Sequence, residues 1–173
     1  MNSGFKIVPL DKSHKREDFQ CNDEPVLEKY LKQLAGQDAK KNLARVYVAT
    51  PESEMSRILG FYTLSMAHLM FEELPVEVKK NKYPENYQIP VARLGRLAVD
   101  SRSQKQGIGE ALLMNVLCRA LQISEAVGAV GVVVDAKHEK AKAFYQKYGF
   151  VELTTKPLTL LILMATIKNA CGV

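Results

Sequence analysis

The chain has 173 residues, of which 47% are hydrophobic and 25% charged, and it carries a formal net charge of +5. This length suits one domain with a full core and the composition excludes a disordered chain, so we expect a single domain over residues 1–173. The positive charge favours anionic partners but does not by itself indicate nucleic acid.

The sequence contains no segment typical of export or of membrane insertion. The N-terminal residues lack the unbroken apolar stretch of a signal peptide, and the longest apolar run, residues 158–167, is about half the length that crosses a bilayer. Cys21, Cys118 and Cys171 have no C-x-x-C spacing, which suits a reducing compartment. We therefore expect a soluble, cytoplasmic protein that does not bind membranes.

The predicted elements of the first half alternate between strand and helix. In chain order they are a strand at residues 5–10, a helix from residue 25 that continues to about residue 41, a hairpin of residues 44–50 and 58–70, and a short helix at 73–80. Asn22 and Asp23 precede Pro25, as capping residues do before a first helical turn. Enrichment in β-branched and aromatic residues on both sides of a turn indicates the hairpin.

The second half continues this alternation. Its predicted elements are a strand at residues 89–99, a helix at 107–127, a strand at 129–134, a helix at 138–148, and closing strands at 150–153 and 157–167. The helix at 107–127 has a clear apolar stripe, and the run 129–134 is typical of a strand buried on both faces. Gly149 stands where a helix-ending glycine is expected. The sequence thus predicts one mixed α/β domain.

A turn with two glycines lies between the predicted strand at 89–99 and the long helix. It reads Gln104-Lys-Gln-Gly-Ile-Gly109 and is followed by Glu110. Backbone N–H groups and the positive end of a helix dipole meet at such a turn and can bind phosphate. A dinucleotide-binding motif would need a third glycine where Leu112 stands, and a P-loop would need Lys and Ser or Thr at its end. Taken alone, the glycines could equally serve close packing of the helix on the strand.

This turn and a second motif resemble the GCN5-related N-acetyltransferase (GNAT) superfamily. Gln104, Gly107 and Gly109 fit its acetyl-CoA signature Gln/Arg-x-x-Gly-x-Gly/Ala. The segment Ala143-Phe-Tyr-Gln-Lys-Tyr-Gly-Phe150 resembles its aromatic helix that ends in Gly-Phe. The resemblance implies the GNAT fold, an α/β (α+β) domain with a mixed, mostly antiparallel central sheet of about six to seven strands flanked by helices. It also implies acetyl-CoA as the co-substrate.

The resemblance further implies which residues bind acetyl-CoA. In the superfamily, the backbone amides of this turn hold the pyrophosphate, and the preceding strand lines the pantetheine arm and offers an N–H group to the thioester carbonyl. The residues implied here are Leu97, Val99, Gln104, Lys105, Gln106, Gly107, Ile108, Gly109 and Glu110. The histidines are scattered along the chain, so we expect no metal site.

Tyr145 matches the tyrosine that serves as general acid in many of these enzymes. Acetyl transfer from a thioester to an amine needs a proton for the leaving thiolate, and a phenol of pKa ~10 can supply it. Periodicity alone favours a core role, since Phe144, Tyr145 and Tyr148 share a helical face. A general base is not evident in the sequence. An α-amine of pKa ~7.7–8.0 needs less help than a lysine of pKa ~10.4, which favours an α-amine as acceptor.

A narrower resemblance covers nearly the whole chain. Residues 19–21, 30–31, 37–38, 45–49, 60–65, 93–100 and 157–160 are similar to the GNAT toxins of bacterial type II toxin–antitoxin systems. These toxins acetylate the α-amine of the amino acid on charged tRNA, block translation and are neutralised by a ribbon–helix–helix antitoxin. The resemblance implies the same activity and partners, and a homodimer. One departure is Gln20-Cys21-Asn22, where the family more often has Asp-Cys-Gly.

Basic side chains are candidates for tRNA binding, because phosphate contacts dominate affinity for nucleic acids. The candidates are Lys40, Lys41, Arg45, Lys82 and Arg93. For any single one of them, a solvated, solubilising surface is the more common explanation. Two other functions stay open: acetylation of a small amine or a protein N-terminus, and a catalytically silent module that binds coenzyme A or a protein partner.

Overall fold

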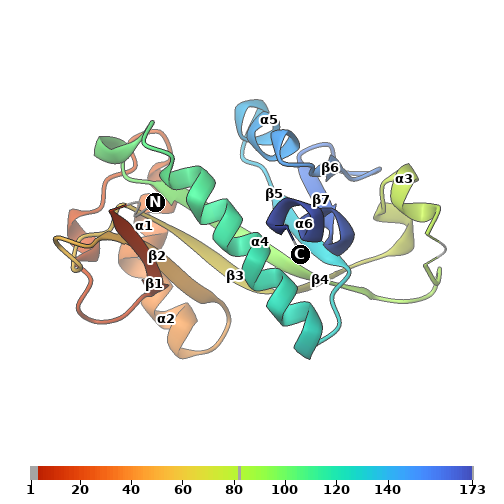
Figure 1. Ribbon diagram of the computed structural model, residues 1–173, viewed down its shortest axis with the longest axis horizontal. Coiled ribbons are helices and arrows are strands. Elements are labelled where there is room, and N and C mark those ends of the chain that lie inside the picture. The colour runs from red at the N-terminus through yellow and green to blue at the C-terminus, as the bar shows by residue number, and fades with distance from the viewer. Residues whose placement is uncertain (1–3, 82, 173) are drawn as a thin grey trace. The chain divides into compact units, whose positions relative to one another are not determined.

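A seven-stranded sheet forms the framework of the computed structural model, which describes residues 4–81 and 83–172 (Figure 1). The strands follow the order β1-β2-β3-β4-β5-β7-β6. Their bounds are β1 Phe5–Pro9, β2 Arg45–Pro51, β3 Gly60–Leu69, β4 Ile89–Val99, β5 Gly131–Asp135, β6 Val151–Glu152 and β7 Thr159–Leu163. The pairs β1–β2, β2–β3, β5–β7 and β6–β7 are antiparallel, and β4–β5 is parallel. The prediction of a mixed, mostly antiparallel sheet is confirmed.

Most helices lie in the connections between strands, and α6 follows the last strand. Their bounds are α1 Pro25–Gln33, α2 Ala35–Lys40, α3 Val76–Lys79, α4 Ile108–Ala126, α5 Glu139–Lys147 and α6 Met164–Cys171, with short 3₁₀ helices at Arg16–Asp18, Phe71–Glu73 and Ser101–Ser103. Within residues 4–81 and 83–172, no helix is long and apolar enough to span a lipid bilayer.

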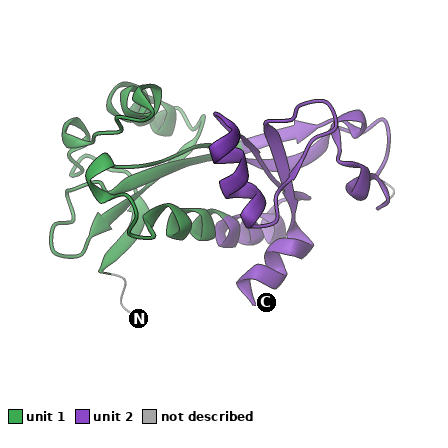
Figure 2. Cartoon of the chain, turned by 90° about the horizontal axis from the view of Figure 1, so that it is seen from above, with its two compact units in different colours: residues 1–65, 95–116 green, residues 66–94, 117–173 purple. Residues whose placement is uncertain are grey.

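The chain divides into two compact units (Figure 2). The first comprises Met1–Ser65 and Gly95–Val116, and the second comprises Met66–Leu94 and Leu117–Val173. The elements β3, β4 and α4 each begin in one unit and end in the other. Each unit is therefore assembled from two separate stretches of the sequence.

The core of the first unit is rich in aromatic rings. Phe61 of β3 is fully buried and contacts Phe19 edge-on, with ring centroids 5.6 Å apart. Tyr30 of α1 stacks on the same Phe61 ring at 6.2 Å. Leu31 of α1 and Val48 of β2 belong to the same buried cluster. This cluster fixes α1, and the segment that leads into it, against the first strands of the sheet.

The core of the second unit is aliphatic and centres on β5. Val132, Val133 and Val134 are all buried, which confirms the prediction of a strand covered on both faces. The parallel register with β4 runs from Ala92↔Val132 to Leu94↔Val134. On its other edge β5 pairs with β7.

The prediction for the last strand is wrong beyond Leu163. There β7 ends, and α6 begins at Met164. Met164, Ile167 and Cys171 recur at helical spacing, and Ile167 is buried while most of its neighbours are exposed. The helix brings the Cys171 Sγ to 3.0 Å from the Cys118 Sγ of α4, both as free thiols.

The first predicted helix is interrupted rather than continuous. Leu34, with a φ of −117° and 47% exposed, separates α1 from α2. Gly36 follows in the first turn of α2, where a Cβ would lie 2.8 Å from the Arg16 Nη1. Because glycine has a low helix propensity, helical continuity is weakest here. The strand predicted at 150–153 and the helix predicted at 73–80 are also present in shorter form, as β6 and α3.

Candidate active site

The end of β4 leads directly into the turn that the sequence singles out. After Val99, Asp100 caps the short 3₁₀ helix Ser101–Ser103, and α4 begins at Ile108. Ile108 is buried, whereas Gln104 through Gly107 are exposed. The turn is thus held from both ends while its own residues face solvent.

Two residues of this turn have a left-handed backbone. Lys105 has a φ of 63° and Gly107 a φ of 79°. Such residues within a turn direct successive N–H groups to one side, which creates a concave anion site. A Cβ on Gly107 would meet open space, so glycine is required there by its backbone conformation and not by crowding.

The start of α4 adds further donors at the same place. The first bond of the helix runs from the Ala111 N–H to the Gly107 carbonyl over 3.0 Å. The N–H groups of Ile108, Gly109 and Glu110 therefore have no carbonyl acceptor within α4 and are available to a ligand. The positive end of the helix dipole lies here as well, which favours a negatively charged group.

Neither the backbone conformation nor the packing at position 109 requires a glycine. Gly109 is not in the left-handed region, and a Cβ there would lie 3.5 Å from the Val99 Cγ2, an ordinary contact. A small residue at this position leaves the first N–H groups of α4 open to close approach by a ligand. The turn therefore has the geometry of a phosphate-binding site.

Tyr145 lies on α5, in the second unit. It is 7% exposed, and its ring packs against Phe144 and Phe150 with centroids 5.2 Å and 5.5 Å away. The core role that periodicity favours is therefore present. Burial raises the pKa of the Tyr145 phenol, so the hydroxyl keeps its proton at neutral pH. A protonated phenol is the form that a general acid requires.

The predicted cofactor residues form one continuous region of the first unit. Leu97 and Val99 lie on β4, and residues 104–110 follow in the turn and the first turn of α4. Tyr145 belongs to the second unit.

The predicted tRNA-binding residues are divided between the units. Lys40, Lys41 and Arg45 are exposed where α2 leads into β2, in the first unit. Arg93 lies on β4 in the second unit, with its Nη1 3.6 Å from the Asp135 Oδ2. Lys82 lies outside the described residues.

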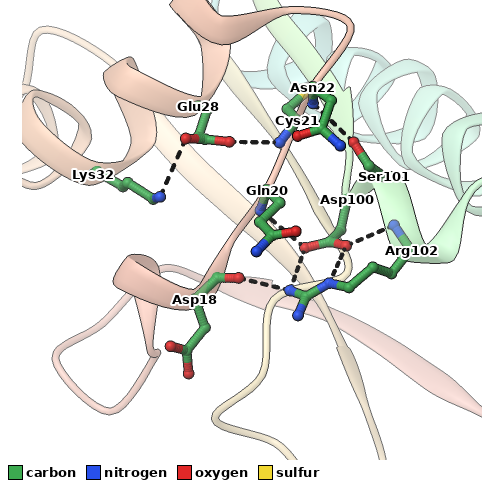
Figure 3. Close-up of polar contacts among 9 residues, drawn as sticks. All are labelled: Asp18, Gln20, Cys21, Asn22, Glu28, Lys32, Asp100, Ser101 and Arg102. Carbon is green, nitrogen blue, oxygen red and sulfur yellow. Dashed lines mark hydrogen bonds and ion pairs between the residues drawn. The ribbon is translucent and has the colours of Figure 1, made fainter.

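Asp100 is not among the predicted site residues, yet it borders both β4 and the turn (Figure 3). Its carboxylate is buried and accepts hydrogen bonds from Arg102 and Gln20. Burial alone would raise the pKa of Asp100, but these hydrogen bonds outweigh it and hold the pKa below its usual value. An Asp before Ser-Arg-Ser is typical of a local turn, but that pattern does not reveal a partner far away in the sequence.

A pocket of about 300 Å³ borders the turn within the first unit. Its lining includes Gln106 and Ile108 of the turn region, with Arg57 and Arg102 as cationic groups. In the described part of the chain, no group of three or more His, Cys, Asp or Glu side chains is placed to hold a metal ion.

The family model described as "Acetyltransferase (GNAT) domain" matches residues 42–152. The chain belongs to the GNAT acetyltransferases. It is therefore an N-acetyltransferase that uses acetyl-CoA, and the match spans both the turn and Tyr145.

Relatives of this GNAT chain have more specific descriptions. The tRNA-acetylating toxin of Mycobacterium tuberculosis is 32% identical over 149 residues, which is 86% of each chain. AtaT complexed with acetyl-methionyl-tRNAfMet has a TM-score of 0.87 and 29% identity, covering 96% of this chain and 99% of the other. A tyrosine-to-phenylalanine mutant of the AtaT toxin, bound to the C-terminus of the antitoxin AtaR and to acetyl-CoA, has a TM-score of 0.82 and 25% identity, covering 98% and 99%.

Proposed function

We propose that this acetyltransferase modifies the α-amine of aminoacyl-tRNA and thereby acts as a toxin that blocks translation. The observation that carries the proposal is the 32% identity to a tRNA-acetylating toxin over 86% of both chains. The likeness to AtaT with acetyl-methionyl-tRNAfMet supports the same acceptor. Both similarities extend well beyond the acetyl-CoA turn, and so include parts of the chain that would contact an acceptor.

The proposed reaction assigns a role to each part of the site. The amides of residues 104–110 hold the pyrophosphate of acetyl-CoA, and the Val99 N–H polarises the thioester carbonyl, which is a preorganised donor for developing negative charge. The amine nitrogen attacks the carbonyl carbon and the C–S bond breaks. The thiolate takes its proton from Tyr145, while the amine releases one proton as the amide forms. That proton restores the phenol through solvent.

The proposed site has a general acid, Tyr145, but no assigned general base, and an α-amine is the acceptor that needs a base least. An ordinary α-amino group has a pKa of ~7.7–8.0, so a substantial fraction is neutral near pH 7. A lysine side chain of pKa ~10.4 would be almost wholly protonated and would need a strong base. Tyr145, with its raised pKa, stays protonated and gives rather than takes a proton.

Exposed basic residues supply the proposed tRNA contacts. Lys40, Lys41 and Arg45 lie close together in the sequence and are free to reach phosphates from the surface of the first unit. The pair between Arg93 and Asp135 is partly exposed, and such pairs contribute little, so Arg93 can exchange its partner for a phosphate. Lys82 is proposed for the same role.

The proposed partners follow from the toxin relatives. A ribbon–helix–helix antitoxin would neutralise the enzyme, as supported by the AtaT chain bound to the C-terminus of its antitoxin. We also propose a homodimer, and a site of action in the cytoplasm, where charged tRNA is used.

The test is acetylation of total charged tRNA with labelled acetyl-CoA, followed by identification of the labelled amino acid. We expect the label on the amino acid released from tRNA, and none on uncharged tRNA. The Tyr145→Phe variant serves as the low-activity control. Label on free amines or protein N-termini, with none on charged tRNA, would overturn the proposal.

A further inference from the structure

We infer that Asp100 is a positioning residue for acetyl-CoA: its buried carboxylate ties the pyrophosphate-binding turn to residues 18–23 and so fixes the turn. The inference rests on the proposed role of that turn in binding pyrophosphate. Asp100 itself is not proposed to touch any substrate.

Every oxygen of the Asp100 carboxylate is used inside the protein (Figure 3). The Oδ1 accepts from the Arg102 backbone N–H at 2.9 Å and from its Nε at 3.0 Å. The Oδ2 accepts from the Arg102 Nη2 at 2.9 Å and from the Gln20 backbone N–H at 3.0 Å. The side chain is 0% exposed. Hydrogen bonds to an ionised group are stronger than those between neutral groups, so the carboxylate holds its partners firmly in place.

Other hydrogen bonds join the same two segments. The Ser101 N–H donates to the Gln20 carbonyl at 2.8 Å, and the Asn22 N–H donates to the Ser101 Oγ at 2.8 Å. The Arg102 Nη2 also donates to the Asp18 carbonyl at 2.6 Å. Together these hydrogen bonds hold the start of the turn region against the 18–23 segment (Figure 3).

The 18–23 segment is itself anchored in the core. The side chains of Phe19 and Cys21 are buried among the rings and aliphatic groups of the first unit. The Cys21 N–H donates to the Glu28 Oε1 at 2.8 Å, and Glu28 in turn pairs with Lys32 at 3.2 Å on α1. Residues 19 and 21 thus point inward, while the backbone at 20 and 22 bonds to the turn region. The turn is fastened to a rigid support.

The turn needs such support because of its backbone. Lys105 has a φ of 63°, which a residue with a side chain does not favour, so surrounding contacts must hold it. The Gln104 Nε2 donates to the Asp23 Oδ2 at 3.4 Å, which extends the support to the first residue of the turn. The end of β4 has a separate support, since the Asp100 N–H donates to the Leu59 carbonyl at 2.8 Å. Loss of the carboxylate should therefore loosen the turn and spare the strand.

The experiment compares Asp100→Asn with wild-type protein by calorimetry with acetyl-CoA and by steady-state kinetics. We expect the Kd and KM for acetyl-CoA to rise about tenfold, because binding must then order the turn, with kcat changed less than about twofold. S-acetylpantetheine, which lacks the pyrophosphate, should react with unchanged kcat/KM. The matched control is Asp38→Asn, since Asp38 accepts from the Tyr30 hydroxyl at 2.8 Å within the same unit but on α2. Its acetyl-CoA affinity should equal that of wild type.

Unchanged acetyl-CoA affinity in Asp100→Asn would overturn the inference. An equal loss with S-acetylpantetheine would also overturn it, because it would indicate general damage to the fold. If Asp100→Asn does not fold, Ser101→Ala takes its place, with an expected rise of about threefold in Kd, and wild-type affinity there would count against the inference. Calorimetry needs no acceptor. If wild-type protein binds acetyl-CoA but leaves charged tRNA unmodified, the proposed function is contradicted and the inference about Asp100 is not.

Discussion

Tyr145 combines a packing role with a proposed chemical one. Its ring fills the space between Phe144 and Phe150, as the helical periodicity suggests, while its hydroxyl is the group that the GNAT resemblance assigns to proton transfer. The two roles use different atoms, so they do not compete. A substitution that removes only the oxygen separates them.

The Tyr145→Phe variant should therefore keep its fold and lose most of its activity. The ring contacts remain, so the melting temperature and the acetyl-CoA Kd should stay close to those of wild type. The rate of acetyl transfer should fall by about 10² to 10⁴, the usual contribution of a positioned general acid. Single-turnover acetylation measures the rate, and Tyr148→Phe, at the C-cap of the same helix, is the control. Wild-type turnover in Tyr145→Phe would remove this residue from the mechanism.

Asp100 should make stability depend on acid pH. Its folded-state pKa is lowered relative to the ~3.9 of an unfolded chain, so its stabilisation is present above about pH 4 and is lost as pH falls through the folded-state value. Wild type should be more stable than Asp100→Asn at pH 7, and the difference in the free energy of unfolding should shrink below about pH 4. Urea titrations from pH 7 to pH 3 measure it. A difference that stays constant to pH 3 would contradict the assignment.

At the scale of elements, substitution by alanine should affect stability differently at the two glycines at the start of α4. Gly107→Ala should lower the free energy of unfolding by about 1–2 kcal/mol, because its φ of 79° disfavours a Cβ. Gly109→Ala should be neutral or stabilising by up to about 1 kcal/mol, since its Cβ meets only an ordinary contact and alanine favours helix. Urea unfolding of both variants measures the contrast. Equal destabilisation would show that the turn conformation is not the cause.

The elements that could be predicted are those with a single clear periodicity. The strand at 89–99 has the predicted bounds, and α4 agrees within about a residue at each end. The apolar run at 158–167 suits both a strand and a helix, and only its position beside β5 and the helical spacing after Leu163 separate the two. The break at Leu34 was not predicted, because the apolar spacing continues through it, and the proximity of Arg16 to Gly36 cannot be inferred from local sequence.

The same distinction applies to the site. The turn at residues 104–109 is local in sequence, so its glycines and its place between strand and helix predicted its geometry. The support around Asp100 joins residues about 80 positions apart, and much of it involves backbone groups, whose positions no side-chain pattern encodes. Contacts of that kind become visible only in the folded chain.

At the scale of the whole molecule, the two units should unfold together. β3, β4 and α4 each pass from one unit to the other, so melting one unit would break elements of its neighbour. Thermal unfolding followed by circular dichroism and by calorimetry should give one coincident transition. Two resolved transitions would contradict the expectation of one domain over residues 1–173.

The net charge of +5 should make the reaction with tRNA sensitive to salt. If Lys40, Lys41 and Arg45 each contact a phosphate, turnover at low tRNA concentration should fall about 20-fold between 50 and 200 mM salt. Acetyl-CoA binding should change much less, because it involves few phosphates and backbone donors. Initial rates and calorimetry over the same salt range measure the two. Turnover that does not depend on salt would favour a small acceptor.

The division of the chain also bears on how such an enzyme can diversify. The first unit, with the turn at residues 104–110, uses Met1–Ser65 and Gly95–Val116, and the second, with Tyr145, uses the remaining stretches. After any single crossover between two related genes, at least one unit would therefore contain residues from both parents. Exchanging one whole unit by a single recombination event is excluded by this order. A chimera made by one crossover therefore combines residues of two parents inside one unit, where close packing makes further substitutions necessary.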